Sequence, residues 1–337
     1  MKSLLLEAFE GKNSRVPAWF MRQAGRYLPE YQVIKENYSL DQMFSIPELA
    51  SDITCLPVAI LGVDAAILFA DILTLPAGMG FNVHFENKGG PVVENPFRNS
   101  GDLKALHDVE DLPSLCETIS LTCEKLPADT PLIGFAGSPF TVLAYLLEGK
   151  TSVQSPHIVK FIIEAPELYH KIMEKLTQNT ILYFKMQKEC GIKVFQLFDT
   201  WAGILRPSDY ARWVLPYVQQ IFKAVDLPSI YFAKNTAHLL PLANKIPVDF
   251  LSVDHSVVIG HNSLLETTKK GLQGNLFNGL LYADEKTLKK EVNDILIGAQ
   301  KHKRFIFNLS HGVLPDTDVE KLKYVVDVVH DFDWGND

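Results

Sequence analysis

The chain has few cysteines and no long apolar run, and these absences exclude several classes of protein. Only four of its 337 residues are cysteines, and none forms a Cys-x-x-Cys pair. No disulfide framework is expected, and reduced thiols in a cytoplasmic protein are predicted. The N-terminal run of leucines ends after three residues, and no apolar stretch approaches the roughly 20 residues that span a bilayer. We therefore expect neither a signal peptide nor a membrane segment.

Positive charge is also scarce. Lysine and arginine number 32 against 40 aspartates and glutamates, so the net charge is −8. A nucleic-acid interface needs clustered lysines and arginines, so no nucleic-acid partner is expected. Any anionic ligand must be attracted by a local basic patch rather than by the overall charge.

The common cofactor and metal motifs are missing as well. The chain has no G-x-G-x-x-G after a strand-like segment, no phosphate-binding P-loop and no H-E-x-x-H helix. We therefore predict an activity that uses neither a metal nor a cofactor.

Apolar residues, by contrast, make up 47% of the chain, which is enough for a large core. They include short continuous runs of the kind typical of strands buried on both faces of a parallel sheet. The runs are Ala18–Met21, Ala65–Ala70, Leu132–Ala136, Val194–Phe198, Ile230–Ala233, Phe250–Val253, a short Gly-rich one at Gly271–Gly274, and Phe305–Leu309.

Segments with helical periodicity separate these runs. One such segment begins at Pro47, and three others cover Pro166–Lys188, Lys286–Gln300 and Asp318–His330. A strand followed by a helix, repeated about eight times, predicts a single (β/α)8 TIM-type barrel over residues 1–337. The irregular stretch Pro76–Thr130 predicts elaborated loops at the C-terminal face, with a hairpin near Val83–Val93.

Catalytic residues of such barrels lie where the strands end, and Asp71 follows one of the apolar runs directly. A carboxylate in so apolar a setting is costly unless it has partners. Two roles are open for it: a cap on the next helix, or an acceptor for a ligand's N–H groups and a counter-charge to a developing cation.

The most distinctive string is Met21–Tyr31, which reads MRQAGRYLPEY. It places Arg22 and Arg26 around Gly25. An arginine fork suits carboxylates or phosphates, and glycine lets a backbone approach a ligand. Two solvated arginines at the start of a helix are the alternative. The whole string resembles the N-terminal signature of the uroporphyrinogen decarboxylase family.

Other segments carry the same resemblance. The residues around Asp71 are similar to the family's I-L-F-S-D-I-L motif, with Ala70 in place of serine, and the family's aspartate is the central substrate-binding residue. Gly134–Thr141 with the later Tyr145 resembles the second family signature. The alternative for Tyr145 is a half-buried helix aromatic.

Two further segments extend the likeness toward the C-terminus. Phe198–Trp201 resembles F-D/E-S/T-W/H and implies a binding role for Thr200, which could also cap the following helix. Asn308–Pro315 resembles N-L-G-H-G-V/I-x-P, with Ser310 replacing glycine, and implies a role for His311, for which a structural histidine is the alternative. Gln273–Leu276 also fits, but Phe277-Asn278 stands where the family has Asp-Pro.

The resemblance implies the decarboxylation of the four acetate side chains of uroporphyrinogen III to methyls. The products are coproporphyrinogen III and CO2, in haem biosynthesis, and the implied assembly is a homodimer. By resemblance the catalytic residues are Asp71, Arg22, Arg26, Tyr145 and His311. The implied substrate-binding residues are Arg22, Gln23, Ala24, Gly25, Arg26, Lys35, Asp71, Tyr145, Thr200 and His311. Lys35 could equally be a solvated helix lysine, and Arg206 is interpreted as a surface charge.

The chemistry agrees with these residue types. Protonation of the pyrrole carbon beside an acetate makes a cationic ring that accepts the electrons of the broken bond, so no cofactor is needed. Asp71 suits the counter-charge, and the arginines suit the substrate's carboxylates. Tyr145, His311 or an arginine acting through water could donate the proton.

Two other classes of protein are alternatives. Corrinoid or thiol methyltransferases share this barrel but need a zinc site, usually a His-x-Cys pair with a later cysteine, and no cysteine here falls in such a pair. A non-catalytic porphyrin-binding protein is the other alternative. The retention of Asp71 with Arg22, Arg26 and Tyr145 favours the enzyme.

Overall fold

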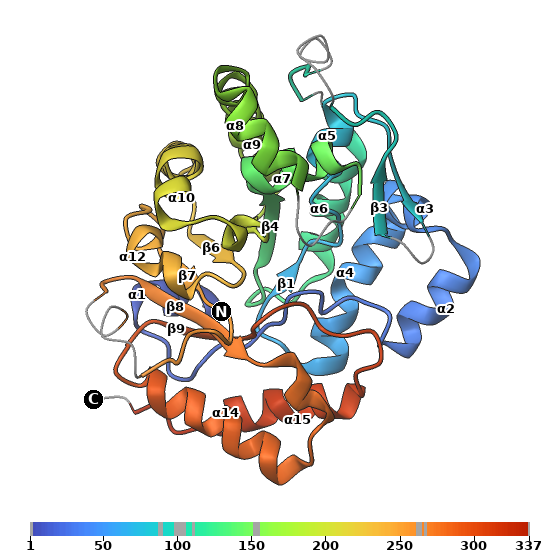
Figure 1. Ribbon diagram of the computed structural model, residues 1–337. Helices are drawn as coiled ribbons and strands as arrows, with labels where there is room; N and C mark the ends of the chain where they lie inside the picture. The colour runs from blue at the N-terminus through green and yellow to red at the C-terminus, as the bar shows by residue number, and fades with distance from the viewer. Residues whose placement is uncertain are drawn as a thin grey trace.

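The centre of the molecule is a sheet of seven parallel strands, in spatial order β1-β4-β5-β6-β7-β8-β9 (Figure 1). The computed structural model describes residues 3–86, 90–97, 106–109, 112–150, 156–260, 265 and 268–335. Each neighbouring pair of strands is parallel. The strands are β1 (Ala66–Ile67), β4 (Leu132–Gly137), β5 (Val194–Asp199), β6 (Ser229–Ala233), β7 (Phe250–Ser252), β8 (Gly271–Leu276) and β9 (Phe305–Leu309).

These strands form the core, as their apolar runs predicted. Every residue of β4, β6, β8 and β9 is buried. The Gly-rich run is the strand β8, and its first glycine has a packing reason. A Cβ on Gly271 would lie 2.6 Å from Cε2 of Phe250, so only glycine lets this ring cover the strand.

The first predicted strand, at Ala18–Met21, is wrong. This segment makes only an isolated parallel bridge to Phe307 of β9. Side chains take over several of its backbone groups: Asp64 accepts from Ala18 N at 2.8 Å, Gln23 from Phe20 N at 3.0 Å and Asn308 from Met21 N at 3.1 Å. On its other side, Asp64 N donates to Ala18 O at 2.8 Å, which ties the segment to the residues before β1.

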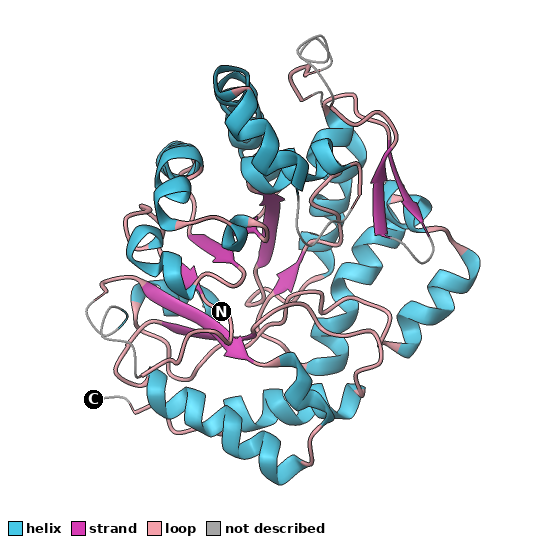
Figure 2. Ribbon diagram, viewed as in Figure 1, coloured by secondary structure: helices cyan, strands magenta, loops and turns pink. Residues whose placement is uncertain are grey.

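Helices surround the sheet (Figure 2). The predicted helices begin and end within two residues of the observed ones, because their apolar periodicity faces the sheet. The α-helices are α1 (Leu4–Glu10), α2 (Pro29–Asn37), α3 (Leu40–Ser45), α4 (Pro47–Leu61), α5 (Thr74–Gly78), α6 (Pro113–Lys125), α7 (Pro139–Glu148), α8 (Pro156–Glu164), α9 (Pro166–Cys190), α10 (Pro207–Trp213), α11 (Leu215–Ala224), α12 (Leu240–Ala243), α14 (Glu285–Ala299) and α15 (Val319–His330). The 3-10 helices are η2 (Ala202–Ile204), η3 (Ala237–Leu239) and η4 (Asn278–Tyr282).

A separate hairpin of β2 (Val83–Glu86) and β3 (Gly90–Val93) stands beside α3, away from the central sheet (Figure 1). This confirms the predicted hairpin. Phe85 packs on Phe44 of α3, with ring centroids 5.1 Å apart. Residues 87–89, 98–105, 110 and 111 of the predicted loop lie outside the described residues.

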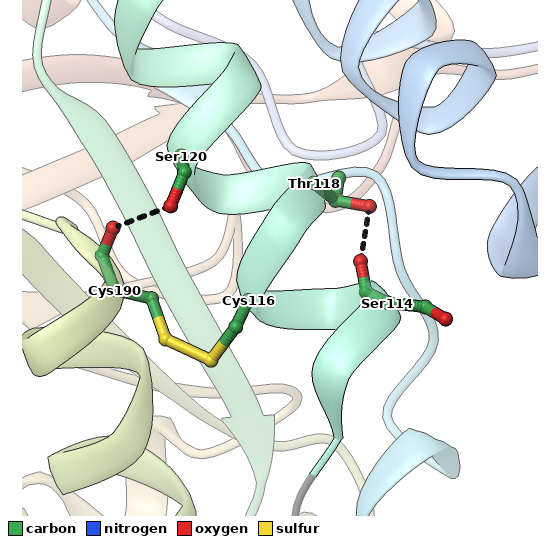
Figure 3. Close-up of a disulfide and its surroundings, with 5 residues drawn as sticks. All are labelled: Ser114, Cys116, Thr118, Ser120 and Cys190. Atoms are coloured by element: carbon green, nitrogen blue, oxygen red, sulfur yellow. Dashed lines mark hydrogen bonds between the residues drawn. A yellow bond between two sulfur atoms is a disulfide. The ribbon is translucent and has the colours of Figure 1, made fainter.

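A disulfide joins Cys116 of α6 to Cys190 at the end of α9 (Figure 3). The prediction of four reduced thiols is wrong for this pair. The two cysteines are 74 positions apart in the chain, but α6 and α9 pack together and bring their Cα atoms to 5.2 Å. Cys55 and Cys123 are free thiols. Within the described ranges, none of the helices combines the length and the apolar character that crossing a membrane requires.

Candidate active site

Arg22 occupies a constrained turn just after the segment that contacts β9. Its φ is 59°, a left-handed value that is uncommon for a residue other than glycine. Gln23 stabilises the turn, because its buried side-chain amide accepts from Phe20 N and donates to Ala65 O, each at 3.0 Å. The Tyr27 hydroxyl donates to Gln23 O at 2.6 Å. The turn therefore fixes the direction in which the Arg22 side chain leaves the backbone.

The predicted binding residues of this turn contribute in different ways. Arg22 and Arg26 are exposed, and among the residues with a described placement neither forms an ion pair. Gln23 uses its side chain inside the protein, and Ala24 packs against the core. A Cβ on Gly25 would lie 3.2 Å from Arg22 O, so glycine leaves room for the turn.

Asp71 lies at the entrance to α5. Its Oδ1 accepts from Leu73 N at 2.9 Å, and Thr74 Oγ1 accepts from Asp71 N at 3.3 Å. Thr74 thus supplies a hydroxyl to the backbone of Asp71, and Ala70 has none to offer. The N-cap of α5 is Leu73 and has no side-chain cap bond, so Asp71 is not a side-chain cap of that helix.

Burial raises the pKa of Asp71, while the hydrogen bond from Leu73 N and the charge of Arg22 lower it. Asp71 Oδ2 has no hydrogen-bond partner in the part of the chain that the structure describes. A half-buried carboxylate near a cation, with an oxygen to spare, can accept a ligand's N–H groups.

His311 follows β9 by two residues and is half-buried. Burial and the charges of Arg22 and Lys234, opposed by the charge of Asp254, together lower the pKa of His311 to about 4. The imidazole is therefore neutral at neutral pH. The groups that affect the pKa of His311 come from three places: Lys234 follows β6, Asp254 follows β7, and Arg22 lies in the arginine turn.

Lys234 and Asp254 were not predicted as site residues. The feature of the sequence that could have identified them is their position, because each directly follows an apolar run. Asp254 is buried and accepts hydrogen bonds from the backbone N–H groups of Asn235 and Ser256. It therefore holds the loop after β6, which carries Lys234, against the loop after β7.

Aromatic rings connect β4 and β5 with His311. The ring centroids of Phe135 and Phe198 lie 5.6 Å apart, and those of Phe198 and Phe232 lie 5.7 Å apart. Phe232 is 6.3 Å from the His311 ring. These rings give the site an apolar wall beside its charged groups.

A buried carboxylate fixes the start of α7. Asp199 accepts hydrogen bonds from the hydroxyls of Ser138 at 2.5 Å, Thr141 at 2.9 Å and Tyr231 at 2.8 Å. Burial raises the pKa of Asp199, and the three hydroxyl donors lower it. Ser138 is also the N-cap of α7, so the network locks this helix to the end of β5.

This network sets the positions of Tyr145 and Thr200. Tyr145 lies two turns along α7, with its ring 6.1 Å from that of Trp201. Thr200 is half-buried next to Asp199 and is not a helix cap, because the N-cap of η2 is Trp201. That alternative for Thr200 is wrong.

Two other basic residues lie apart from this group. Lys35 is in α2, and among the described residues it forms no hydrogen bond or ion pair with Arg22, Asp71 or His311. Arg206 pairs with Asp209 at 2.6 Å on the exposed surface, as expected for a surface charge. In the described ranges, no three His, Cys, Asp or Glu side chains gather as a metal site would require.

The whole chain is similar to known proteins of one family. The family model for uroporphyrinogen decarboxylase (URO-D) matches residues 1–332. The uroporphyrinogen decarboxylase of Thermodesulfovibrio yellowstonii is 41% identical over 100% of both chains. That of Carboxydothermus hydrogenoformans is 39% identical over 98% of this chain and 97% of its own, and that of Thermus thermophilus is 39% identical over 98% of each.

Solved structures give the same fold with distant sequences. A methyltransferase from Methanosarcina mazei has a TM-score of 0.80 at 21% identity over 98% of both chains. A B12-independent methionine synthase from a Shewanella species has a TM-score of 0.58 at 9% identity, over 84% of this chain and 89% of its own. At these identities the likeness concerns the fold alone.

Proposed function

The chain belongs to the uroporphyrinogen decarboxylase family, and we propose that it converts the four acetate side chains of uroporphyrinogen III to methyls. The products are coproporphyrinogen III and CO2, in the biosynthesis of tetrapyrroles. One observation carries the assignment to this site: the Arg22 side chain lies against Gly312, next to His311, and its charge lowers the pKa of both Asp71 and His311, so a cation, a carboxylate and an imidazole share one region.

The proposed fold is a closed (β/α)8 barrel formed by residues 1–337 as one unit. Residues 17–20 close the ring between β9 and β1, although they make only an isolated bridge and not a regular strand. Two hydrogen bonds support this: Phe307 N donates to Pro17 O at 2.8 Å, and Asp64 N donates to Ala18 O at 2.8 Å. Active sites of such barrels lie beyond the C-terminal ends of the strands, where Lys234, Asp254 and His311 follow theirs.

The reaction needs an electron sink, and the pyrrole ring supplies it. A proton adds to the ring carbon next to the one that bears the acetate and leaves the ring cationic, with positive charge shared by the carbon that bears the acetate. The bond to the carboxylate then breaks, its electron pair neutralises the ring, and CO2 departs. A second proton adds to the exocyclic carbon while the first leaves the ring, so one acetate plus one proton gives one methyl plus CO2.

Asp71 is the proposed counter-charge to the ring cation. Its oxygens accept pyrrole N–H groups, and an anion in a poorly hydrated site stabilises a nearby cation strongly. Burial raises the pKa of the free carboxyl, and the arrival of a cation favours the ionised form.

Arg22 and Arg26 hold the substrate's carboxylates in this proposal, with Lys35 and the Thr200 hydroxyl as further contacts. Both guanidinium groups are exposed. Gln23, Ala24 and Gly25 act through the turn that they form. A substrate with eight carboxylates approaching a chain of net charge −8 requires such a basic patch.

The proton donor is Tyr145, His311 or an arginine acting through water. His311 is neutral in the free protein at neutral pH, and a bound carboxylate would raise its pKa. No metal or cofactor takes part in the proposed reaction.

We place the enzyme in the cytoplasm as a homodimer. Disulfides persist mainly in oxidising compartments, so trapping thiols in intact cells tests the placement. A Cys116–Cys190 pair that is fully oxidised there contradicts it. Sedimentation at micromolar concentration tests the dimer, and a stable monomer contradicts it.

Anaerobic incubation with uroporphyrinogen III, followed by chromatography of the oxidised porphyrins, tests the function. The number of porphyrin carboxylates should fall from eight to four without an added metal or cofactor. Binding without loss of carboxylates indicates a porphyrin-binding protein. Methyl transfer that chelators abolish and zinc restores indicates a methyltransferase.

A further inference from the structure

A chain of hydrogen bonds runs from the loop after β7 to the backbone of His311. His255 Nδ1 lies 3.2 Å from Ser310 Oγ, and the Ser310 hydroxyl donates to Asn278 Oδ1 at 2.9 Å. The Asn278 amide nitrogen then donates to His311 O at 3.0 Å and to Gly312 O at 2.6 Å. One amide side chain therefore forms hydrogen bonds with two successive backbone carbonyl groups.

The donors and acceptors along this chain are fully consistent. Each amide proton of Asn278 has its own carbonyl acceptor, and the amide oxygen takes the Ser310 proton. Ser310 Oγ must then accept from His255, which fixes the proton on His255 Nδ1. Asn278 and Ser310 are 6% and 2% exposed. His255 is exposed, so the buried part of the network is the Asn278–Ser310 pair and the carbonyls it contacts. Buried groups that are all paired are held rigidly, and breaking their bonds leaves unpaired polar groups.

Two members of this network, Asn278 and Ser310, are positions where the chain departs from the family pattern described above. Asn278 stands where that pattern has proline, and Ser310 where it has glycine. Proline lacks the amide side chain and glycine lacks the hydroxyl, so this pair of contacts needs both departures. Phe277, which stands in place of aspartate, packs on the His255 ring with centroids 4.8 Å apart. The departures therefore form one connected arrangement.

The two carbonyl groups that accept from Asn278 belong to the loop that carries the His311 imidazole. Val313 N donates to Met21 O at 2.9 Å, so the far end of this loop is also fixed. Ser310 N donates to Leu276 O at 2.8 Å, so backbone bonds hold the loop on both sides of His311, whose side chain must be directed at the substrate in the proposed function. A misplacement of the order of 1 Å in a catalytic group can cost a large factor in rate.

We propose that Asn278, supported by Ser310, is a positioning residue for His311 in this chain. The inference rests on the proposed function, in which His311 contacts the substrate. Asn278 acts through the backbone of the His311 loop and does not itself contact the substrate.

Asn278→Ala and Asn278→Asp test this directly. The aspartate variant keeps the size and the acceptor for Ser310 but turns an oxygen toward two carbonyl oxygens. Both variants should lower kcat/KM for uroporphyrinogen by about tenfold, the effect of losing buried hydrogen bonds. The matched control is Asn244→Asp, because among the described residues the Asn244 side chain only accepts from the Thr268 hydroxyl, at 2.7 Å, and aspartate keeps that acceptor. The control should retain wild-type kcat/KM.

A double-mutant cycle separates positioning from general stability. In a His311→Gln background, Asn278→Ala should cost less than about threefold, because its effect passes through the missing imidazole. The same loss in both backgrounds contradicts the proposal. So does a folded Asn278→Ala variant with wild-type kcat/KM.

If the Asn278 variants do not fold, Ser310→Ala takes their place, since it removes the hydrogen bond to Asn278 Oδ1 and leaves the two bonds from the Asn278 amide to the His311 loop. It should lower kcat/KM severalfold, and an unchanged value contradicts the proposal. The His311 imidazole signal in a histidine NMR titration gives a readout that needs no turnover. Asn278→Ala or Ser310→Ala should shift the signal and its titration midpoint, while Asn244→Asp should not. If the wild type does not convert uroporphyrinogen, the proposed function fails, and an unmoved His311 signal then contradicts the positioning role separately.

Discussion

Gly312 lies directly against the side chain of Arg22. A Cβ at position 312 would be 2.6 Å from Arg22 Cγ and 3.0 Å from Arg22 Cβ. Real Cβ atoms do not approach other atoms so closely, and the atoms concerned are near the base of the arginine. The His311 loop and the arginine turn are therefore fitted to each other, and a side chain on Gly312 would displace Arg22.

Gly312→Ala should weaken substrate binding more than folding. The added methyl should swing the Arg22 guanidinium away from its position and raise KM by about tenfold, the effect of losing one charge-assisted hydrogen bond. Steady-state kinetics and thermal melts of the same preparations check this. An unchanged KM contradicts the expectation that the position of Arg22 matters for binding.

Arg22→Ala and Arg26→Ala should each reduce kcat/KM by about tenfold or more. Each removes a charge-assisted donor to a carboxylate, worth roughly 1.5–3 kcal/mol. Arg206→Ala is the control, because this arginine is exposed and pairs with Asp209. If the two signature variants behave like the control, the basic patch does not bind the substrate.

The stability of the protein should depend on His311 at acid pH. The folded pKa is about 4 against an ordinary value of 6.5, so between these values the unfolded chain binds more protons. Stability should therefore fall as the pH drops from 6.5 toward 4 and should not depend on this group above 6.5. Urea unfolding across this range checks it, and His311→Gln should flatten the slope. Identical slopes in both proteins contradict the assignment.

The Cys116–Cys190 disulfide should stabilise the purified protein. It links residues 74 positions apart, and a crosslink of this kind typically contributes about 2–4 kcal/mol by restricting the unfolded chain. Addition of a reductant should lower the melting temperature. Cys116→Ser should melt at that lower temperature and not respond to reductant. Equal melting temperatures with and without reductant contradict this.

The sequence predicted most of the sheet because burial on both faces leaves a continuous apolar run. It failed at Ala18–Met21, where the side chains of Asp64 and Asn308 take the place of strand partners. Those residues are distant in the chain, and so are the two cysteines of the disulfide. Such pairings depend on packing that no local pattern encodes.

The site was predicted in part for a similar reason. The positions of Arg22, Asp71 and His311 follow from strand ends and family motifs, but their mutual electrostatic effects depend on the assembled fold. Lys234 follows a strand as clearly as Asp71 does, yet no motif marked it. The departures at Asn278 and Ser310 had no explanation until the structure brought them within 2.9 Å.

Asp71 should cost the folded protein stability at neutral pH. Burial raises its folded pKa above the ordinary value of 3.8, so the folded state binds the proton more tightly than the unfolded state. The free energy of unfolding should fall as the pH rises from about 3.8 through the raised pKa of Asp71, and it should stay lower above that pKa. Asp71→Asn keeps the acceptor for Leu73 N and has no charge to bury. This variant should therefore melt no lower than the wild type.

Turnover of uroporphyrinogen by Asp71→Asn, measured beside its thermal melt and beside Asp71→Glu, tests the central claim most directly. If Asp71 is the counter-charge to the protonated ring, the asparagine variant should fold and lose nearly all turnover. The glutamate variant keeps the charge, displaced on the order of 1 Å, and should retain some. A folded Asp71→Asn variant that produces coproporphyrinogen at a near-normal rate would contradict the account.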